Sequence, residues 1–398
     1  MTGPLAIDMA YLVDTLKTMV SIDSILPHEE RLAEFIANEL RTMDVEPEWH
    51  EVALGRPNVY CAVDLGPADR FLVFSGHSDT VGVASGWETD PFQLTERDGR
   101  LHGLGAVNMK GGLACSLAAF KALVEGKELH GSLGRLGFAV TVDQEGHSIG
   151  AKALLKTEYG RCDAMLHAEH FYGDTEEDYL PIAVTGKVLY KLTVRGHAAH
   201  AFRPHLGVNA VADASRIVAA LDRLRLKEHP LFGTGTVCTL KIEGGYKQYA
   251  MVVPEHCEVV ITRLIVPGET QETAVQDMRE LIDSLGLESE VEIETPPPCY
   301  DPYFLDRSTP ILTMFQEGYQ EVIGIDPHFA GHSGIVDANV FVAEGNIPTI
   351  VFGPKGANHH SAGEYVELAT LEPVARVYAE TARRFLSCRS LEWEERKR

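Results

Sequence analysis

Five residues spread over the chain are of the types that bind a divalent metal ion through nitrogen and oxygen. They are His77, Asn108, Glu145, Glu169 and His360, and most of them lie near the end of a short apolar run. Imidazole nitrogens and carboxylate oxygens are common zinc ligands. If the apolar runs are neighbouring parallel strands, their carboxyl ends bring these side chains to one edge of a sheet. The pattern therefore predicts a metal site.

A series of short motifs adds a family resemblance that covers almost the whole chain. The motifs are Gly-His-Ser-Asp at 76–79, Met-Lys-Gly-Gly at 109–112, Gly-His-Ala-Ala-His at 196–200 with Pro204, Gly207 and Asn209, Val-Val-Pro at 252–254, and Gly-Pro at 353–354 leading to His360. With these motifs the chain resembles the aminoacylase, acetylornithine deacetylase, succinyl-diaminopimelate desuccinylase and glutamate carboxypeptidase family of di-zinc amide hydrolases.

The resemblance implies a role for each candidate ligand. His77 and Glu169 would hold one metal ion, and Glu145 and His360 would hold the second. Asp79 would accept the second ring N–H of His77 and so fix its tautomer. The cofactor is expected to be zinc, although other divalent metals would suit the same ligands.

Two amide side chains occupy the positions where the family has a bridging carboxylate and a general base. Asn108 offers one good oxygen and an NH₂ group without a free lone pair, and it removes one negative charge from the cluster. We therefore expect about one zinc ion per subunit. Gln144 cannot take a proton from an attacking water, and loss of a general base usually lowers a rate roughly 10²–10⁴-fold. The catalytic site is predicted to be atypical.

Three further residues are implied by the resemblance to meet the substrate. His200 would reach the active site of the partner subunit and polarise the substrate carbonyl or stabilise its oxyanion. Asn209 and Arg263 are candidate substrate-binding residues. Arg263 departs from the family pattern, because Leu264 occupies the second position of the usual arginine pair and a one-residue offset on a strand turns a side chain to the other face.

Four additional histidines lie next to the candidate ligands, namely His147, His167, His170 and His359. Imidazole titrates near neutral pH, so any of them could replace the missing base or add a ligand. A histidine near a strand end is more often a surface residue or one with satisfied hydrogen bonds. Both interpretations stay open for each residue. Together they suggest a rebuilt site.

Composition limits the class of protein. A chain of 398 residues exceeds one ordinary core, which favours two domains. The net charge of −23 argues against nucleic acid or an anionic membrane as partner. Seven cysteines without a C-x-x-C pair indicate reduced thiols of a cytoplasmic protein. We expect neither a signal peptide nor a membrane span, because no apolar run reaches about 18 residues.

The apolar periodicities predict an α/β fold. Helices are expected at 7–22, 29–43, 109–124, 151–156 and 310–322, and strands at 58–65, 71–76, 136–142, 164–167 and 349–352. Their alternation indicates a catalytic domain with a mostly parallel central sheet and flanking helices. This domain is predicted in two parts, at 1–184 and 297–398.

A smaller α/β domain is predicted to interrupt the catalytic domain at 185–296. Strands are expected at 187–195, 258–265 and 291–294, with helices at 209–226 and 271–285. The prolines at 296–298 indicate a stiff linker. In the family this insert is the dimerisation lid, so the resemblance implies a homodimer.

Three classes of function fit these observations. The first is a metal-dependent amide-bond hydrolase with a modified site, acting on a small N-acyl amino acid or a peptide-like carboxylate. The second is a non-hydrolytic enzyme on the same scaffold, carrying out acyl transfer, condensation or elimination on a Lewis-acidic metal. The third is a catalytically inactive binding homologue. Because Asn for Asp and Gln for Glu are isosteric changes, an active-site mutant fits as well.

Overall fold

The computed structural model describes residues 5–127, 130–170, 179–248 and 250–387. The chain divides into two compact units. The first contains Met1–Ile182, Leu305–Ala330 and Val336–Arg398, and the second contains Ala183–Phe304 and Gly331–Ile335. The predicted insert boundaries, 185 and 296, fall inside the second unit.

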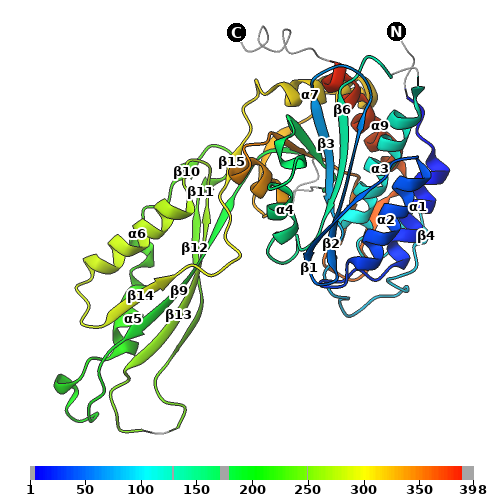
Figure 1. The fold of residues 1–398 in the computed structure, drawn as a ribbon. Helices are drawn as coiled ribbons and strands as arrows, with labels where there is room; N and C mark the ends of the chain where they lie inside the picture. Colours follow the sequence, from blue (N-terminus) through cyan, green and yellow to red (C-terminus); the bar gives the residue numbers. More distant parts are fainter. Residues whose placement is uncertain (1–4, 128–129, 171–178, 249, 388–398) are drawn as a thin grey trace. The chain divides into compact units, whose positions relative to one another are not determined.

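A six-stranded sheet forms the centre of the first unit, with strand order β1-β2-β6-β3-β7-β17 (Figure 1). In this order the strands are Glu48–Ala53, Arg56–Asp64, Arg135–Thr141, Phe71–His77, Ala164–His167 and Thr349–Val351. The last four strands are parallel to one another, and β1 and β2 add antiparallel pairs at one side. This mostly parallel sheet, with its helices, confirms the predicted fold class.

Helices of the first unit fall mainly where the apolar periodicity predicts them. They are α1 (Met9–Ser21), α2 (Glu30–Thr42), α3 (Gly111–Glu125), α4 (Ile149–Leu154), α7 (Pro310–Ile323), α8 (Asp337–Asn339) and α9 (Leu368–Ser387). α3 is built from small and apolar residues and is buried along most of its length, between α1 and α9. The long helix α9 was missed, because Pro373 lies inside it and a proline usually ends a helical pattern.

The second unit contains an antiparallel sheet with strand order β12-β13-β9-β14. These strands are Thr236–Gly244, His256–Ile265, Gly186–Arg195 and Glu290–Glu294. Apolar side chains of the sheet share one core with α5 (Ala210–Ala219) and α6 (Gln271–Ser284), so both helices cover the same face. β12 was not predicted, because it is exposed along most of its length and lacks apolar alternation.

Short strands complete both units. One sheet of the first unit has the order β18-β19-β5-β4, which are Gly356–Ala357, Tyr365–Glu367, Arg100–His102 and Thr95–Arg97. In the second unit, β10 (Glu228–His229) pairs with β11 (Gly233–Thr234). The chain passes from one unit to the other within or next to three short strands, β8 (Leu180–Val184), β15 (Tyr303–Phe304) and β16 (Phe329–His332). In the described part of the chain, no helix combines the length and hydropathy needed to cross a membrane.

Candidate metal centre

The carboxyl edge of the parallel strands carries most of the predicted ligands. His77 is the last residue of β3, Glu145 lies in the loop after β6, and Glu169 lies two residues after β7. Asn108 comes from the segment just before α3, and His360 from the loop between β18 and β19. Parallel strands end at the same edge, so the segments of His77, Glu145 and Glu169 meet there, and those of Asn108 and His360 join them.

A glycine allows the start of α3 to approach this edge closely. A Cβ atom on Gly112 would lie 1.7 Å from the carbonyl oxygen of Ala168, which no side chain can accommodate. The Gly-Gly pair at 111–112 therefore brings the segment that carries Asn108 against the loop that carries Glu169.

Three buried side chains form what we call the inner half of the site, namely His77, His167 and Glu169. Nε2 of His77 has no hydrogen-bond partner and lies 4.0 Å from Oε1 of Glu169. Nε2 of His167 lies 3.3 Å from Oε2 of the same carboxylate. Two imidazole nitrogens thus approach the two oxygens of one carboxylate.

Asp79 orients His77 together with the neighbouring loop. Nδ1 of His77 lies 3.0 Å from the backbone oxygen of Asp79 and 3.4 Å from Oδ1 of its carboxylate. That carboxylate also accepts the backbone N–H groups of Gln144 at 3.1 Å and Glu145 at 2.8 Å. Burial alone would raise the pKa of Asp79, but His77 and these N–H groups outweigh it and lower the pKa.

The electrostatic surroundings of His77 favour a positive charge. Burial opposes protonation, yet the carboxylates of Asp79, Glu169 and Glu145 outweigh it and raise the pKa of His77 to about 10. Surroundings that stabilise an imidazolium in this way also stabilise a metal cation.

Asn108, Glu145 and His360 form what we call the outer half of the site. Nδ2 of Asn108 donates to Oε1 of Glu145 at 2.8 Å and lies 3.0 Å from Nε2 of His360. The same His360 nitrogen lies 2.7 Å from Oε1 of Glu145. This hydrogen bond is the main reason that the pKa of His360 is raised. Oε1 of Glu145 and Nε2 of His360 are therefore engaged with each other and with Nδ2 of Asn108, which hinders binding of a second ion.

Glu364 holds the backbone beneath Asn108. Its carboxylate accepts the N–H groups of Gly105 at 2.8 Å, Val107 at 3.0 Å and Asn108 at 2.9 Å. Burial raises the pKa of Glu364 to about 7, although these hydrogen bonds oppose the shift. Its position close to His360 in the sequence gave no indication of this role.

A buried ion-pair cluster supports the loop after β6. Arg56 contacts Glu29 through its guanidinium and lies 2.8 Å from Oδ1 of Asp143. The other oxygen of Asp143 accepts the backbone N–H of His147 at 2.9 Å. Arg56 thus fixes the turn that presents Glu145, although nothing in the sequence near Arg56 marked it as part of the site.

The predicted substrate-binding residues of the second unit have internal partners. Arg263 is fully buried and lies 2.6 Å from Glu269 and 2.9 Å from Asp277. A substrate carboxylate would have to displace these two, so Arg263 is better explained as a structural residue. The side-chain oxygen of Asn209 caps α5 by accepting two backbone N–H groups. His200, also in the second unit, is exposed, and its Nδ1 accepts the N–H of Phe202 at 3.1 Å.

The inner half fits a metal ion better than the outer half does. Within the described residues, no three His, Cys, Asp or Glu side chains are already grouped as tightly as a metal requires. However, Nε2 of His77 and Nε2 of His167 are buried without hydrogen-bond partners, as expected of donor atoms that serve a cation. His77 and Glu169 would hold one ion after a small movement of the carboxylate.

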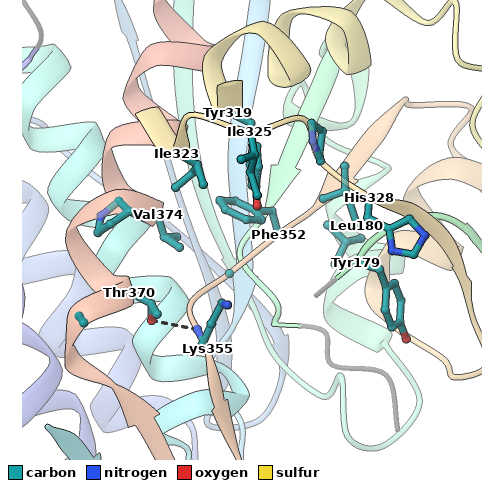
Figure 2. Close-up of a pocket in the computed structure, with 15 residues that line it drawn as sticks. Tyr179, Leu180, Tyr319, Ile323, Ile325, His328, Phe352, Lys355, Thr370 and Val374 are labelled. Atoms are coloured by element: carbon teal, nitrogen blue, oxygen red, sulfur yellow. Dashed lines mark hydrogen bonds between the residues drawn. The ribbon is translucent and has the colours of Figure 1, made fainter. Parts of the chain in front are cut away.

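A separate cavity of about 250 Å³ lies in the first unit (Figure 2). α7, the end of β17 and the start of α9 supply most of its lining, which is largely apolar and includes Tyr319, Phe352 and Val374. Lys355 and His328 add polar atoms to its wall. None of the described residues that line it belongs to the predicted site, and the sequence gave no indication of it.

Parallel strands that end in His and carboxylate side chains can hold a metal ion at their carboxyl edge. The model of Peptidase family M20/M25/M40 matches residues 73–384. The chain therefore belongs to this family, which confirms the resemblance and makes the protein a hydrolase of the metallopeptidase type.

Curated relatives carry a more specific name. The chain is 26% identical over 368 residues to the succinyl-diaminopimelate desuccinylase of Magnetococcus marinus, covering 91% of this chain and 95% of the relative. It is 29% identical over 330 residues to the enzyme of that name from Bordetella petrii, covering 81% and 84%. The match extends over nearly the full length of the first relative.

Solved structures share the fold at lower identity. Aminopeptidase PepT of Bacillus cereus superimposes with a TM-score of 0.77 at 22% identity, covering 95% of this chain and 99% of that one. The YxeP protein of Bacillus subtilis, described as a dinuclear metal-binding peptidase of the M20 family, gives 0.72 at 16% identity, covering 95% and 98%.

Proposed function

We propose that this protein is a metal-dependent amide-bond hydrolase that acts on a small N-acyl amino acid or a peptide-like carboxylate. The observation that carries the proposal is Nε2 of His77, which is buried without a partner beside Glu169 while Nδ1 of the same ring is engaged by Asp79. A single zinc ion is the proposed cofactor. The names of the curated relatives make N-succinyl amino acids the first substrates to examine.

The roles of the residues follow from their contacts. When bound, zinc would act as a Lewis acid on the amide carbonyl. His77 and Glu169 would hold it, and Asp79 would keep the His77 ring in the required orientation. Gln144 can accept a hydrogen bond from an attacking water through its side-chain oxygen but cannot take the proton. We therefore propose a hydrolase that is slow rather than inactive.

The same glutamine favours a second candidate function. Without a carboxylate at 144, attack by water is disfavoured, and a bound acyl group could be transferred to another nucleophile instead. An acyl-transfer enzyme would produce new amide when hydroxylamine or an amino acid is supplied. A binding homologue would form neither this new amide nor the free amino acid that hydrolysis releases.

Metal content and turnover test the proposal together. Protein purified without added metal should contain about one zinc ion per chain and should slowly hydrolyse N-succinyl or N-acetyl amino acids in a chelator-sensitive way. A Glu169→Gln variant should lose both properties. Wild-type protein that takes up no zinc from zinc-containing buffer, and releases no amino acid, would contradict the hydrolase assignment.

We further propose a homodimer formed through the second unit, in the cytoplasm. Support comes from β12, an edge strand whose Leu240 and Ile242 side chains are 58% and 48% exposed. An exposed apolar edge strand is a ready surface for pairing with a second copy. Light scattering should give the mass of a dimer for the wild type and of a monomer for Ile242→Lys. A wild-type monomer would refute the proposal.

In this dimer His200 of one subunit would serve the site of the other. Mixing and refolding two inactive variants, His200→Asn and Glu169→Gln, should then restore part of the activity, because one of the two sites in a mixed dimer keeps both residues. No recovery in mixed dimers of verified composition would restrict His200 to a structural role.

A further inference from the structure

One of the four additional histidines differs from the other three in its surroundings. His147 is exposed, and the rings of His170 and His359 lie edge to face at 5.8 Å. His167 is fully buried at the end of β7, and its ring approaches Glu169. The structure therefore separates His167 from the other candidates for an added ligand.

His167 repeats the arrangement of His77. Its Nδ1 lies 3.1 Å from the hydroxyl oxygen of Ser75, and its Nε2 makes no hydrogen bond although Oε2 of Glu169 is 3.3 Å away. In zinc sites a ligating histidine usually engages its second ring nitrogen with a neighbouring polar group, which orients the other nitrogen toward the ion. Both rings show this pattern, and they face opposite oxygens of one carboxylate.

We propose that His167 is a ligand of the single metal ion, so that His77, His167 and Glu169 together hold it. Three protein ligands of the His₂Glu type with one open position are a common catalytic zinc site. His167 would then take the place of the bridging carboxylate that Asn108 has replaced. The inference rests on the proposed metal site but not on the reaction.

Distances and charge are consistent with this assignment. Ligand atoms around a four-coordinate zinc lie about 3.3 Å apart when each bond is about 2.0–2.1 Å. The contact between His167 and Glu169 already has this length, and the 4.0 Å contact of His77 requires a shift of less than about 1 Å. The buried carboxylate of Asp337 lies close enough for its charge to act on both rings, and it would help balance a cation.

X-ray absorption at the zinc edge tests the proposal, because it counts imidazole ligands independently of activity. Wild-type protein with one zinc should show two imidazoles, and so should His360→Gln, whose native side chain is half-exposed. His167→Gln should show one imidazole and bind zinc at least about 100-fold more weakly than the wild type. Loss of a residue that only orients a ligand typically lowers metal affinity by roughly 10–100-fold. His147→Gln is the matched control and should behave as the wild type.

Other outcomes would overturn the assignment. Two imidazoles in His167→Gln would show that His167 lies beside Glu169 without binding the ion, and one imidazole in His360→Gln would place the ion in the outer half. If His167→Gln does not fold, the spectra of the wild type and His360→Gln still decide. A two-imidazole site in a protein that hydrolyses nothing would refute the proposed function and leave this inference intact.

Discussion

The inner and outer halves of the site contain the same kinds of ligand but differ in burial and in pairing. In the inner half His77 and His167 are fully buried, and each ring directs a nitrogen without a hydrogen bond toward Glu169. In the outer half the His360 side chain is 45% exposed and is bound to Glu145, which also accepts a hydrogen bond from Asn108.

The difference shows how one amide can change the metal content of a site. A carboxylate at 108 would leave Glu145 and His360 to bind an ion, whereas the NH₂ group of Asn108 satisfies Glu145 directly. An ion entering the outer half must break these hydrogen bonds, and the half-exposed side chain of His360 lets solvent weaken its electrostatic attraction there. In the buried inner half, an ion that binds Nε2 of His77 has no hydrogen bond of that nitrogen to break.

The largest effect is expected from restoring both carboxylates. Asn108→Asp with Gln144→Glu should raise the zinc content from about one to two ions per chain. Hydrolysis of N-succinyl or N-acetyl amino acids should increase roughly 10²–10⁴-fold, because a general base is restored. Asn108→Asp alone should raise the zinc content without this increase. Unchanged zinc content and rate in the double variant would show that neither position has the assigned role.

Removing the support of the outer half should destabilise the protein. Arg56→Met leaves Glu29 and Asp143 buried without their cation, which typically costs about 3–5 kcal/mol. Urea unfolding of the metal-free protein measures this change. The control is Arg41→Met, whose ion pair with Glu46 is exposed and contributes at most about 1 kcal/mol. Equal losses of unfolding free energy in both variants would mean that the buried cluster around Arg56 stabilises the protein no more than an exposed ion pair does.

A moderate effect is expected from the residue that serves both halves. Asp79→Asn keeps the shape but weakens the contacts to His77 and to the N–H groups of Gln144 and Glu145. Zinc affinity should fall roughly 10–100-fold, as is typical when a residue that orients a metal ligand is lost. Competition with a chromophoric chelator measures the affinity, and the exposed Asp306→Asn is the control. An unaltered affinity would show that the backbone oxygen of Asp79 orients His77 by itself.

The sequence predicted the fold, and where the candidate ligands lie in it, better than it predicted the contacts these residues make. Strand ends located His77, Glu145 and Glu169 because a parallel sheet gathers its carboxyl ends at one edge. Arg56 lies far from these residues in the sequence, and only tertiary packing brings it beneath the loop. Arg263 was assigned to substrate because a strand pattern cannot show which carboxylates α6 and the turn before it will supply.

The smallest effect concerns the titration of two adjacent histidines in metal-free protein. The hydrogen bond to Glu145 raises the pKa of His360 above 6.5, whereas burial and the charge of His360 lower the pKa of His359. Protonated His360 therefore stabilises the fold below about pH 6.5, and this contribution is lost as the pH rises through its raised pKa. NMR of the imidazole protons should show His360 titrating above 6.5 and His359 below it.

Removing the partner carboxylate isolates the cause of this difference. In Glu145→Gln the midpoint of His360 should fall toward 6.5, because a neutral amide no longer favours the imidazolium. The pKa values of both His77 and His360 are raised, so protons compete with an ion at each half and the zinc content should fall as the pH is lowered. An unchanged midpoint of His360 in Glu145→Gln would show that the hydrogen bond to Glu145 does not cause the difference between the two histidines.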